Sequence, residues 1–298
     1  MPELWQAAAC CGYNFRLWRG SARVAVTFSF AFILCYFMTE RAADFAREHQ
    51  THLQILEPFV WMFGDGTNIL LCSLLLVLLL GDMPFISAGT PFFLLRTSRQ
   101  AWLLGQVAYI VCSTLIYLLF VLASTCLLSA PVAFPGDQWS EAAALLGFSG
   151  LGQRSGIPVD TTTLKMGRPL ECALVTFVLV LLYMLALGLL MMTVHLWKGR
   201  RWALAAVAAY SLWGLRLEPA FFAQIMHLPE GMLYRANVIA GWLSPLNQAC
   251  YPMHSFGYDK LPRIWQSCVL FLTGSAALYL AARDRVRRFS FLFTGTDA

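Results

Sequence analysis

Six long apolar stretches alternate with polar segments along the chain and occupy much of its 298 residues. Most have the roughly 17–25 residues that a helix needs to cross a hydrocarbon core about 30 Å thick. Each is a continuous run of Leu, Val, Ala and Phe, unlike the alternating segments of about ten residues that form membrane barrels. The pattern predicts an all-α, polytopic membrane protein with spans at about 22–38, 59–80, 101–132, 172–197, 202–217 and 264–282.

The composition agrees with this class. Hydrophobic residues make up 59% of the chain and charged residues only 12%, whereas soluble domains carry about 25% charged residues. The six spans and their loops leave no room for a separate soluble domain, so we expect one domain over 1–298. The net charge of +5 is explained by Arg and Lys at cytoplasmic helix ends, and we expect no nucleic-acid partner.

The distribution of basic residues predicts the orientation. One group lies in short segments beside the spans, where positive charge favours the cytoplasmic side; it comprises Arg16, Arg19, Arg23, Arg96, Arg99, Lys198, Arg200, Arg201, Arg283, Arg285, Arg287 and Arg288. The remaining basic residues are spread over long loops that also carry Asp and Glu. We therefore expect a multi-pass protein of the plasma membrane with both termini cytoplasmic, a cytoplasmic tail at 283–298, and outward loops at about 41–58, 133–171 and 218–262.

Two segments do not look like plain spans. In 2–20, apolar residues recur at helical spacing beside Arg16 and Arg19, which predicts an interfacial helix on the cytoplasmic leaflet; the alternative is an ordinary basic leader. Between spans five and six, the apolar pieces 220–226 and 232–243 are interrupted by Pro and Gly. They predict either half-helices that dip into or cap the membrane, or surface helices of an outward loop.

The chain lacks a nucleotide-binding loop of the G-x-x-x-x-G-K-[ST] type. Such a loop needs Gly before its Lys, and the three Lys residues follow Leu164, Trp197 and Asp259. The sequence also has no H-E-x-x-H zinc motif, and His49 with His52 provides too few ligands for a metal centre. We expect no catalytic residue, cofactor or metal site in this chain.

One four-residue match keeps an enzymatic alternative open. Residues 147–150 read Gly-Phe-Ser-Gly and match the G-x-S-G box of rhomboid proteases, in which the serine pairs with a histidine from a later span. Here the box lies in a predicted outward loop, and His195, His227 and His254 lie away from the membrane centre. An intramembrane serine protease using Ser149 is therefore the alternative to a protein without catalytic activity.

The clearest charged residue at membrane depth is Asp65, near the outer end of the second predicted span. Intramembrane carboxylates usually face a cavity or a partner, so Asp65 and Asn68 either line an outward vestibule or mark the membrane boundary.

The order of these elements resembles the permease subunit of type-2 ABC (ATP-binding cassette) exporters, nearest the antimicrobial-peptide and antibiotic export type. The segments 78–85 (LLLGDMPF) and 96–106 (RTSRQAWLLGQ) look like that family's inner loop between spans two and three. The outward loop 133–171 departs from the family in being longer.

The resemblance implies that the inner loop docks on a separate ATPase chain, which would bind ATP and Mg²⁺, and that a second permease copy or a sibling faces the first. Spans one, two and five would line the path of a hydrophobic or amphipathic substrate, such as a peptide, an antibiotic or a lipid-like molecule. An aromatic wall of that path would be formed by Phe28, Phe32, Phe59, Trp61 and Phe63; the alternative is that these residues anchor the helices in lipid. The coupling residues implied by this loop are Asp82, Pro84, Phe85, Phe92, Arg96 and Arg99. A membrane assembly protein without transport activity is a further alternative.

Overall fold

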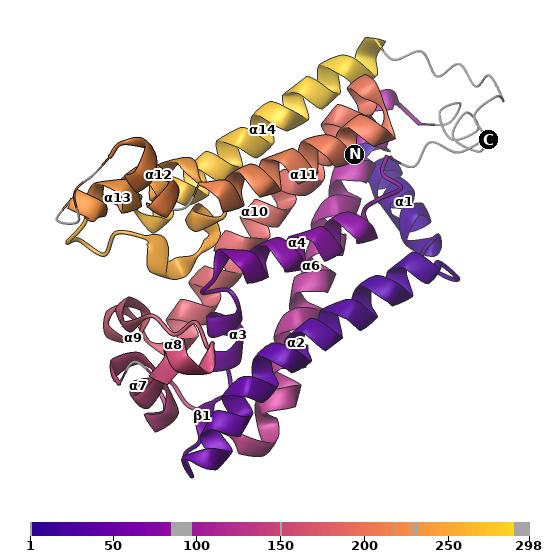
Figure 1. The fold of residues 1–298 in the computed structure, drawn as a ribbon. Helices are drawn as coiled ribbons and strands as arrows, with labels where there is room; N and C mark the ends of the chain where they lie inside the picture. Colours follow the sequence, from indigo (N-terminus) through magenta and orange to yellow (C-terminus); the bar gives the residue numbers. More distant parts are fainter. Residues whose placement is uncertain are drawn as a thin grey trace.

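The computed structural model describes residues 2–84, 97–149, 151–217, 219–227, 229 and 232–288, and these residues are mostly helical. Six helices form the body of the molecule (Figure 1). They are α2 (Ala22–Glu48), α4 (Gly66–Leu79), α6 (Arg99–Ser129), α10 (Pro169–Lys198), α11 (Arg200–Arg216) and α14 (Ile264–Arg288).

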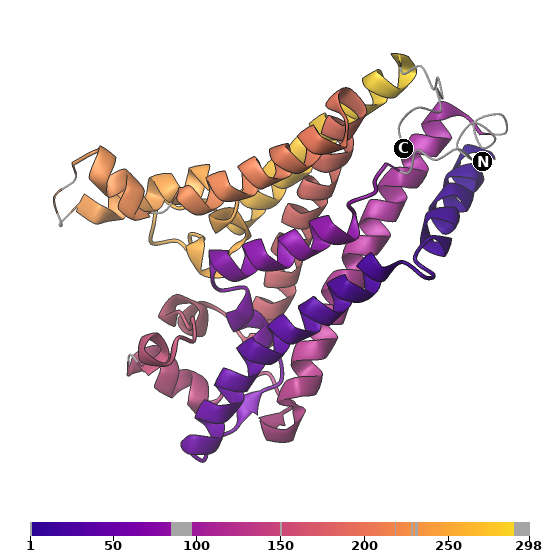
Figure 2. The same ribbon diagram turned by 45° about the vertical axis from the view of Figure 1, so that its right-hand side comes forward.

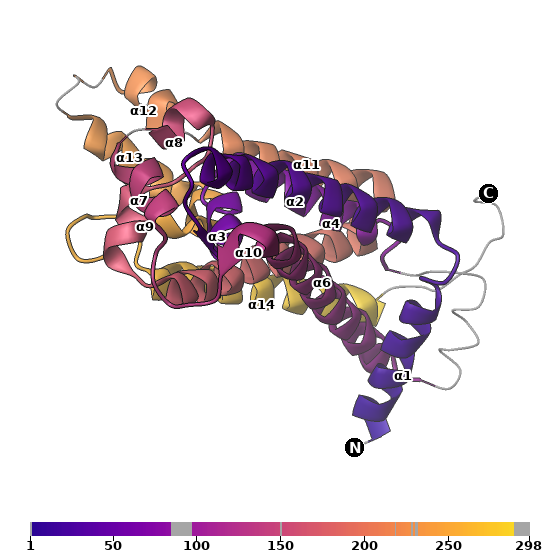
Figure 3. The ribbon, with the colours of Figure 1, turned by 90° about the horizontal axis from the view of Figure 1, so that it is seen from below.

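These six helices form two layers (Figure 3). In one layer α4 lies between α2 and α11, and in the other α10 contacts both α6 and α14. Within the most apolar stretch of each helix, 56% of the α10 residues are buried but only 11% of those of α14. Helix α10 is therefore the centre of the core, and α14 lies at its edge.

Four of the described helices are long and apolar enough to cross a membrane: α2, α6, α10 and α14. The structure therefore agrees with an α-helical membrane protein, but six spans are not confirmed. The second predicted span, 59–80, is divided into α3 (Glu57–Met62) and the 14-residue α4, because the Gly64–Gly66 turn interrupts the helix. The fifth forms α11, whose 17 residues rise only about 25 Å at 1.5 Å per residue.

Helix α2 extends ten residues beyond its predicted span, to Glu48. The extension is amphipathic, which explains why the apolar run alone did not predict it. Ala42, Ala43 and Ala46 are buried, while Arg41 and Arg47 are exposed. The first predicted outward loop, 41–58, is therefore helical over its first part.

One end of the bundle, which we call the loop end, carries the long connections. There α7 (Glu141–Phe148), α8 (Leu151–Ser155) and α9 (Thr161–Met166) occupy much of the predicted loop 133–171. The two-residue strands β1 (Leu53–Gln54) and β2 (Ala133–Phe134) pair in parallel and attach this loop to the segment before α3. The pieces between spans five and six form the short helices α12 (Pro219–Ile225) and α13 (Leu233–Leu243), followed by the turns η3 (Asn247–Ala249) and η4 (Tyr251–Met253).

The opposite end, which we call the basic end, carries α1 (Pro2–Arg16) and the last turn of α14 (Figure 2). The helix expected in 2–20 is present as α1, and one of its faces packs on α6; its placement at a membrane interface stays a prediction. The contact is close at Gly105, where an added Cβ would lie 2.6 Å from the Cβ of Cys10. Trp5, on the outer face of α1, is 78% exposed.

Candidate functional site

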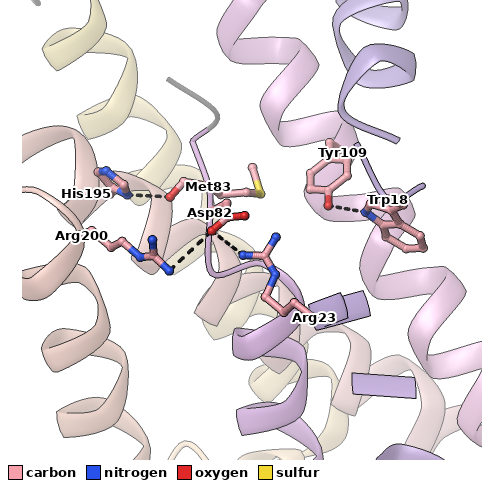
Figure 4. A network of polar contacts seen from close by, with 7 residues as sticks. All are labelled: Trp18, Arg23, Asp82, Met83, Tyr109, His195 and Arg200. Atoms are coloured by element: carbon pink, nitrogen blue, oxygen red, sulfur yellow. Dashed lines mark hydrogen bonds and ion pairs between the residues drawn. The ribbon is translucent and has the colours of Figure 1, made fainter. Parts of the chain in front are cut away.

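At the basic end, Asp82 pairs with two arginines from other helices; it lies at the start of the segment that joins α4 to α6 (Figure 4). Its Oδ1 lies 2.5 Å from Arg23 Nη1 and 3.5 Å from Arg200 Nη2. Arg23 lies in the first turn of α2 and Arg200 begins α11. One carboxylate therefore connects the beginnings of two helices of the same layer to the end of α4.

The next residue connects the same segment to the central helix. The backbone oxygen of Met83 lies 2.6 Å from Nδ1 of His195, in the last turn of α10 (Figure 4). Gly199 allows α11 to begin directly after α10 because its φ of +88° is readily adopted only by glycine. This turn brings His195 and Arg200 to the same side of the segment, where His195 contacts Met83 and Arg200 contacts Asp82 (Figure 4).

The far side of the same connection is also tied to the bundle. Arg99, in the first turn of α6, donates to the backbone oxygens of Arg287 at 2.8 Å and Val286 at 3.4 Å. A guanidinium at the last carbonyls of α14 is favoured because these groups lack helical partners. Arg285 Nε in turn donates to the backbone oxygen of Leu196. We call the contacts of Asp82, Met83 and Arg99 with the helix ends the basic-end knot.

Helix α1 joins this end through α6. Trp18 Nε1 donates to the Tyr109 hydroxyl at 2.7 Å (Figure 4), and Asn14 Nδ2 donates to Gln106 Oε1 at 3.2 Å. Both pairs add hydrogen bonds between α6 and the N-terminal segment. They fix α1 on α6 in one register.

The implied coupling residues are therefore placed only in part. Asp82 and Arg99 belong to the basic-end knot, and Pro84 is buried beside it. Phe85, Phe92 and Arg96 lie outside the described residues.

At the loop end, Asp65 lies in the wall between two cavities. The first, of about 440 Å³, is lined by the turn before α4 together with the segments after α11 and α13. The second, of about 490 Å³, lies between the end of α2, the same turn and the α8–α9 connection. Asp65 and Asp160 line both cavities, and their volumes fall in the range of about 300–1,000 Å³ typical of ligand pockets.

Asn68 lines the second cavity, and only 7% of its surface is exposed. The aromatic residues expected to line the path lie in different environments. Phe59 and Phe63 are fully buried against each other in the core, and Phe28 packs edge-on against Phe120 of α6. Phe32, at 39% exposed, remains on the surface of α2.

Sequence reasoning did not find Glu57, a fully buried carboxylate at the loop end. It accepts hydrogen bonds from the backbone N–H of Gln54 at 3.0 Å and from the N–H and hydroxyl of Ser140, both at 2.7 Å. Burial, only partly offset by these bonds, raises the pKa of Glu57 from 4.5 to about 7. Ser140 also caps α7, so Glu57 attaches the α7–α9 segment to the bundle.

The protease alternative receives no support from the placement of Ser149. Its hydroxyl donates to the backbone oxygen of Leu145 at the end of α7, and no histidine of the described ranges hydrogen-bonds it. The structure does bring another serine to a histidine: His254 Nε2 lies 3.0 Å from Ser267 Oγ. Ser267 is fully buried, so this pair attaches the η4 segment to α14 where no substrate can reach the hydroxyl.

Within the described ranges, no group of three or more His, Cys, Asp or Glu side chains could hold a metal ion. Comparison with family models, with curated proteins and with solved structures finds no match to this chain.

Proposed function

We propose that this chain is the permease subunit of an ATP-driven exporter, powered by a separate ATPase chain and moving a hydrophobic or amphipathic substrate outward across the plasma membrane. The observation that carries the proposal is the basic-end knot. A permease without its own nucleotide site needs a segment that receives force from the ATPase and passes it to the helices around the path.

The connection from α4 to α6 has the attachments that such a segment requires. Asp82 holds the first turns of α2 and α11, Met83 holds the end of α10, and Arg99 holds the end of α14. A force applied to the segment between Pro84 and Thr97 would therefore be transmitted to four helices: α2, α10, α11 and α14. A solvated linker would need none of these contacts.

The layer formed by α2, α4 and α11 provides the second argument. These helices correspond to predicted spans one, two and five, which the resemblance assigns to the path, and they lie side by side (Figure 3). Leu71, Leu74 and Leu78 form an exposed stripe on α4, each 40–43% exposed. We propose that a second copy faces this stripe, because two-fold pairing of one apolar face would enclose a path between identical layers.

The loop-end cavities would form the outer end of the path. Asp65 and Asn68 lie at the far end of the same layer, where a substrate leaving between two copies would meet a polar vestibule. By this orientation the basic end is cytoplasmic, as the positive charges of Arg16, Arg19 and Arg23 favour.

The test is co-purification. The tagged chain is expressed with each ATPase gene encoded beside its own, extracted in mild detergent and captured; we expect one ATPase at stoichiometric yield. The double substitution Phe85→Ala with Phe92→Ala should abolish capture while the chain still inserts. Phe148→Ala is the matched control, because this 60% exposed side chain lies at the loop end. Equal capture by all variants would refute docking on this segment.

A second experiment tests the pairing face. Leu74→Cys should form a disulfide-linked dimer on mild oxidation in membranes. Leu270→Cys, on α14 and 44% exposed, is the matched control and should remain monomeric. Cross-linking of both variants, or of neither, would contradict the assignment of this face.

A further inference from the structure

The second loop-end cavity combines opposite charges that do not neutralise one another. Among the described residues, its charged lining groups are Arg41 from α2, Asp65 from the turn before α4, and Asp160 from the turn before α9. Within the described residues, no hydrogen bond or ion pair is made by the guanidinium of Arg41 or by the carboxylate of Asp65. Charged groups that line a cavity without partners remain available to a ligand of opposite charge.

The local structure explains why Asp65 is available. Asp65 occupies the N-cap position of α4, where an aspartate usually accepts a hydrogen bond from the helix backbone. Its backbone is extended, with φ −121° and ψ 134°, but its side chain accepts no such bond. The carboxylate is half-buried, so it has lost part of its hydration without gaining a partner.

Asn68 supplies an independent observation. Its side chain is more than nine-tenths buried, lines the same cavity and makes no hydrogen bond with any described residue. Buried polar side chains nearly always have a partner, so the amide is suited to bind a group that enters the cavity. An amide can donate or accept, and it can therefore serve either end of a dipolar ligand.

Arg41 contributes to the same lining from α2. Its Nη1 approaches Gly156, where an added Cβ would lie 3.6 Å away. The remaining lining includes Met38, Ile157 and Val159, which suit an apolar part of a ligand. The described lining thus contains one guanidinium, the carboxylates of Asp65 and Asp160, a buried amide and several apolar side chains.

We propose that this cavity binds a zwitterion, with an ammonium group on Asp65 and Asp160 and a carboxylate or phosphate on Arg41. Amino acids and ethanolamine phospholipid headgroups share this chemistry. The inference rests on the cavity and not on the exporter proposal.

Binding is measured by calorimetry on the purified chain, freed of lipid in a non-ionic detergent. The probes are O-phosphoethanolamine and leucine as zwitterions, with ethanolamine and methyl phosphate as analogues that keep one charge. We expect a zwitterion to bind at least about tenfold more tightly than either analogue, since a hydrogen bond to a charged group typically contributes this much. Leucine alone would identify an amino-acid site. Phosphoethanolamine alone, with retention of phosphatidylethanolamine over phosphatidylglycerol in native mass spectra, would identify a headgroup site.

The variants separate the two charges. Arg41→Gln should lower zwitterion affinity to that of ethanolamine, and Asp65→Asn should lower it to that of methyl phosphate. The matched controls are Arg47→Gln, at the exposed end of α2, and Asp259→Asn, which lines only the other cavity; both should bind as the wild type does.

Asn68→Leu provides a third variant of similar size if Asp65→Asn does not fold, and it should also weaken zwitterion binding. Equal binding of zwitterions and singly charged analogues, no binding of any probe at millimolar concentration, or unchanged affinity in the folded variants would each overturn the proposal. Because the assay uses the chain alone, binding without a co-purifying ATPase would leave this inference standing while the proposed function failed.

Discussion

Replacement of Glu57 by Gln should remove the contribution of this carboxyl to the pH dependence of stability at the loop end. The carboxylate is fully buried, and its three hydrogen-bond donors, from Gln54 and Ser140, are all neutral groups. Among the described residues, no cation contacts this carboxylate to compensate for the lost hydration of its charged form. The amide introduced by Glu57→Gln would be neutral at every pH, like the protonated carboxyl of Glu57, and has nearly the same shape.

The size of the effect follows from the pKa of Glu57, which burial raises from 4.5 to about 7. Between these two values the folded chain holds a proton that the unfolded chain has released, so the free energy of unfolding falls as the pH rises. A shift of this size corresponds to about 3 kcal/mol once the pH is above 7. For a chain of this length, that is roughly a 6 °C change in Tm.

The assay is thermal unfolding in detergent from pH 5 to pH 8, with wild type and Glu57→Gln scanned at the same rate. The two should have similar Tm values at pH 5, and the wild type should lose about 6 °C relative to the variant by pH 8. Glu141→Gln, at an exposed carboxylate in the first turn of α7, should follow the wild type. A Tm difference that does not change with pH, or a variant that is less stable than wild type at pH 8, would refute the reasoning.

Three further substitutions probe other contacts. Asp82→Asn should change the free energy of unfolding by no more than about 1 kcal/mol, because its ion pairs are partly exposed, yet it should abolish ATP-driven transport; normal transport would contradict the role of the basic-end knot. Gly105→Ala should overpack the contact between α1 and α6 and lower the free energy of unfolding by about 1–3 kcal/mol. It should also increase the maleimide labelling of Cys10, measured by peptide mass spectrometry; unchanged labelling would count against that packing. Ser267→Ala should lower the free energy of unfolding, measured by chemical denaturation, by about 1–3 kcal/mol because it leaves Nε2 of buried His254 without a partner; an unaffected midpoint would show that the pair does not hold η4.

The sequence predicted the helices that are apolar on all sides. The runs at 101–132, 172–197 and 264–282 became α6, α10 and α14 with small changes at their ends. It did not predict the division of the second span, because Gly64 and Asp65 are only a short interruption in an otherwise continuous apolar run. It also missed the end of α2, where buried small residues alternate with charged ones.

The sequence predicted a site residue only where the residue type was unusual for its surroundings. Asp65 stands out as a carboxylate within apolar sequence, and the structure places it at a cavity wall. Phe59 and Phe63 are buried in the core, because an apolar side chain looks the same in sequence whether it faces a core, a path or lipid. Glu57 and Ser140 are 83 positions apart, so no local pattern could show their contact.

The most direct test of the central claim is ATP hydrolysis by the captured membrane complex, reconstituted in lipid with and without vanadate. We expect vanadate-sensitive ATP hydrolysis that requires this chain, together with a stoichiometric ATPase that remains bound. A chain that purifies from every co-expression without an ATPase, or hydrolysis that does not depend on its presence, would contradict the proposal that it is a permease subunit.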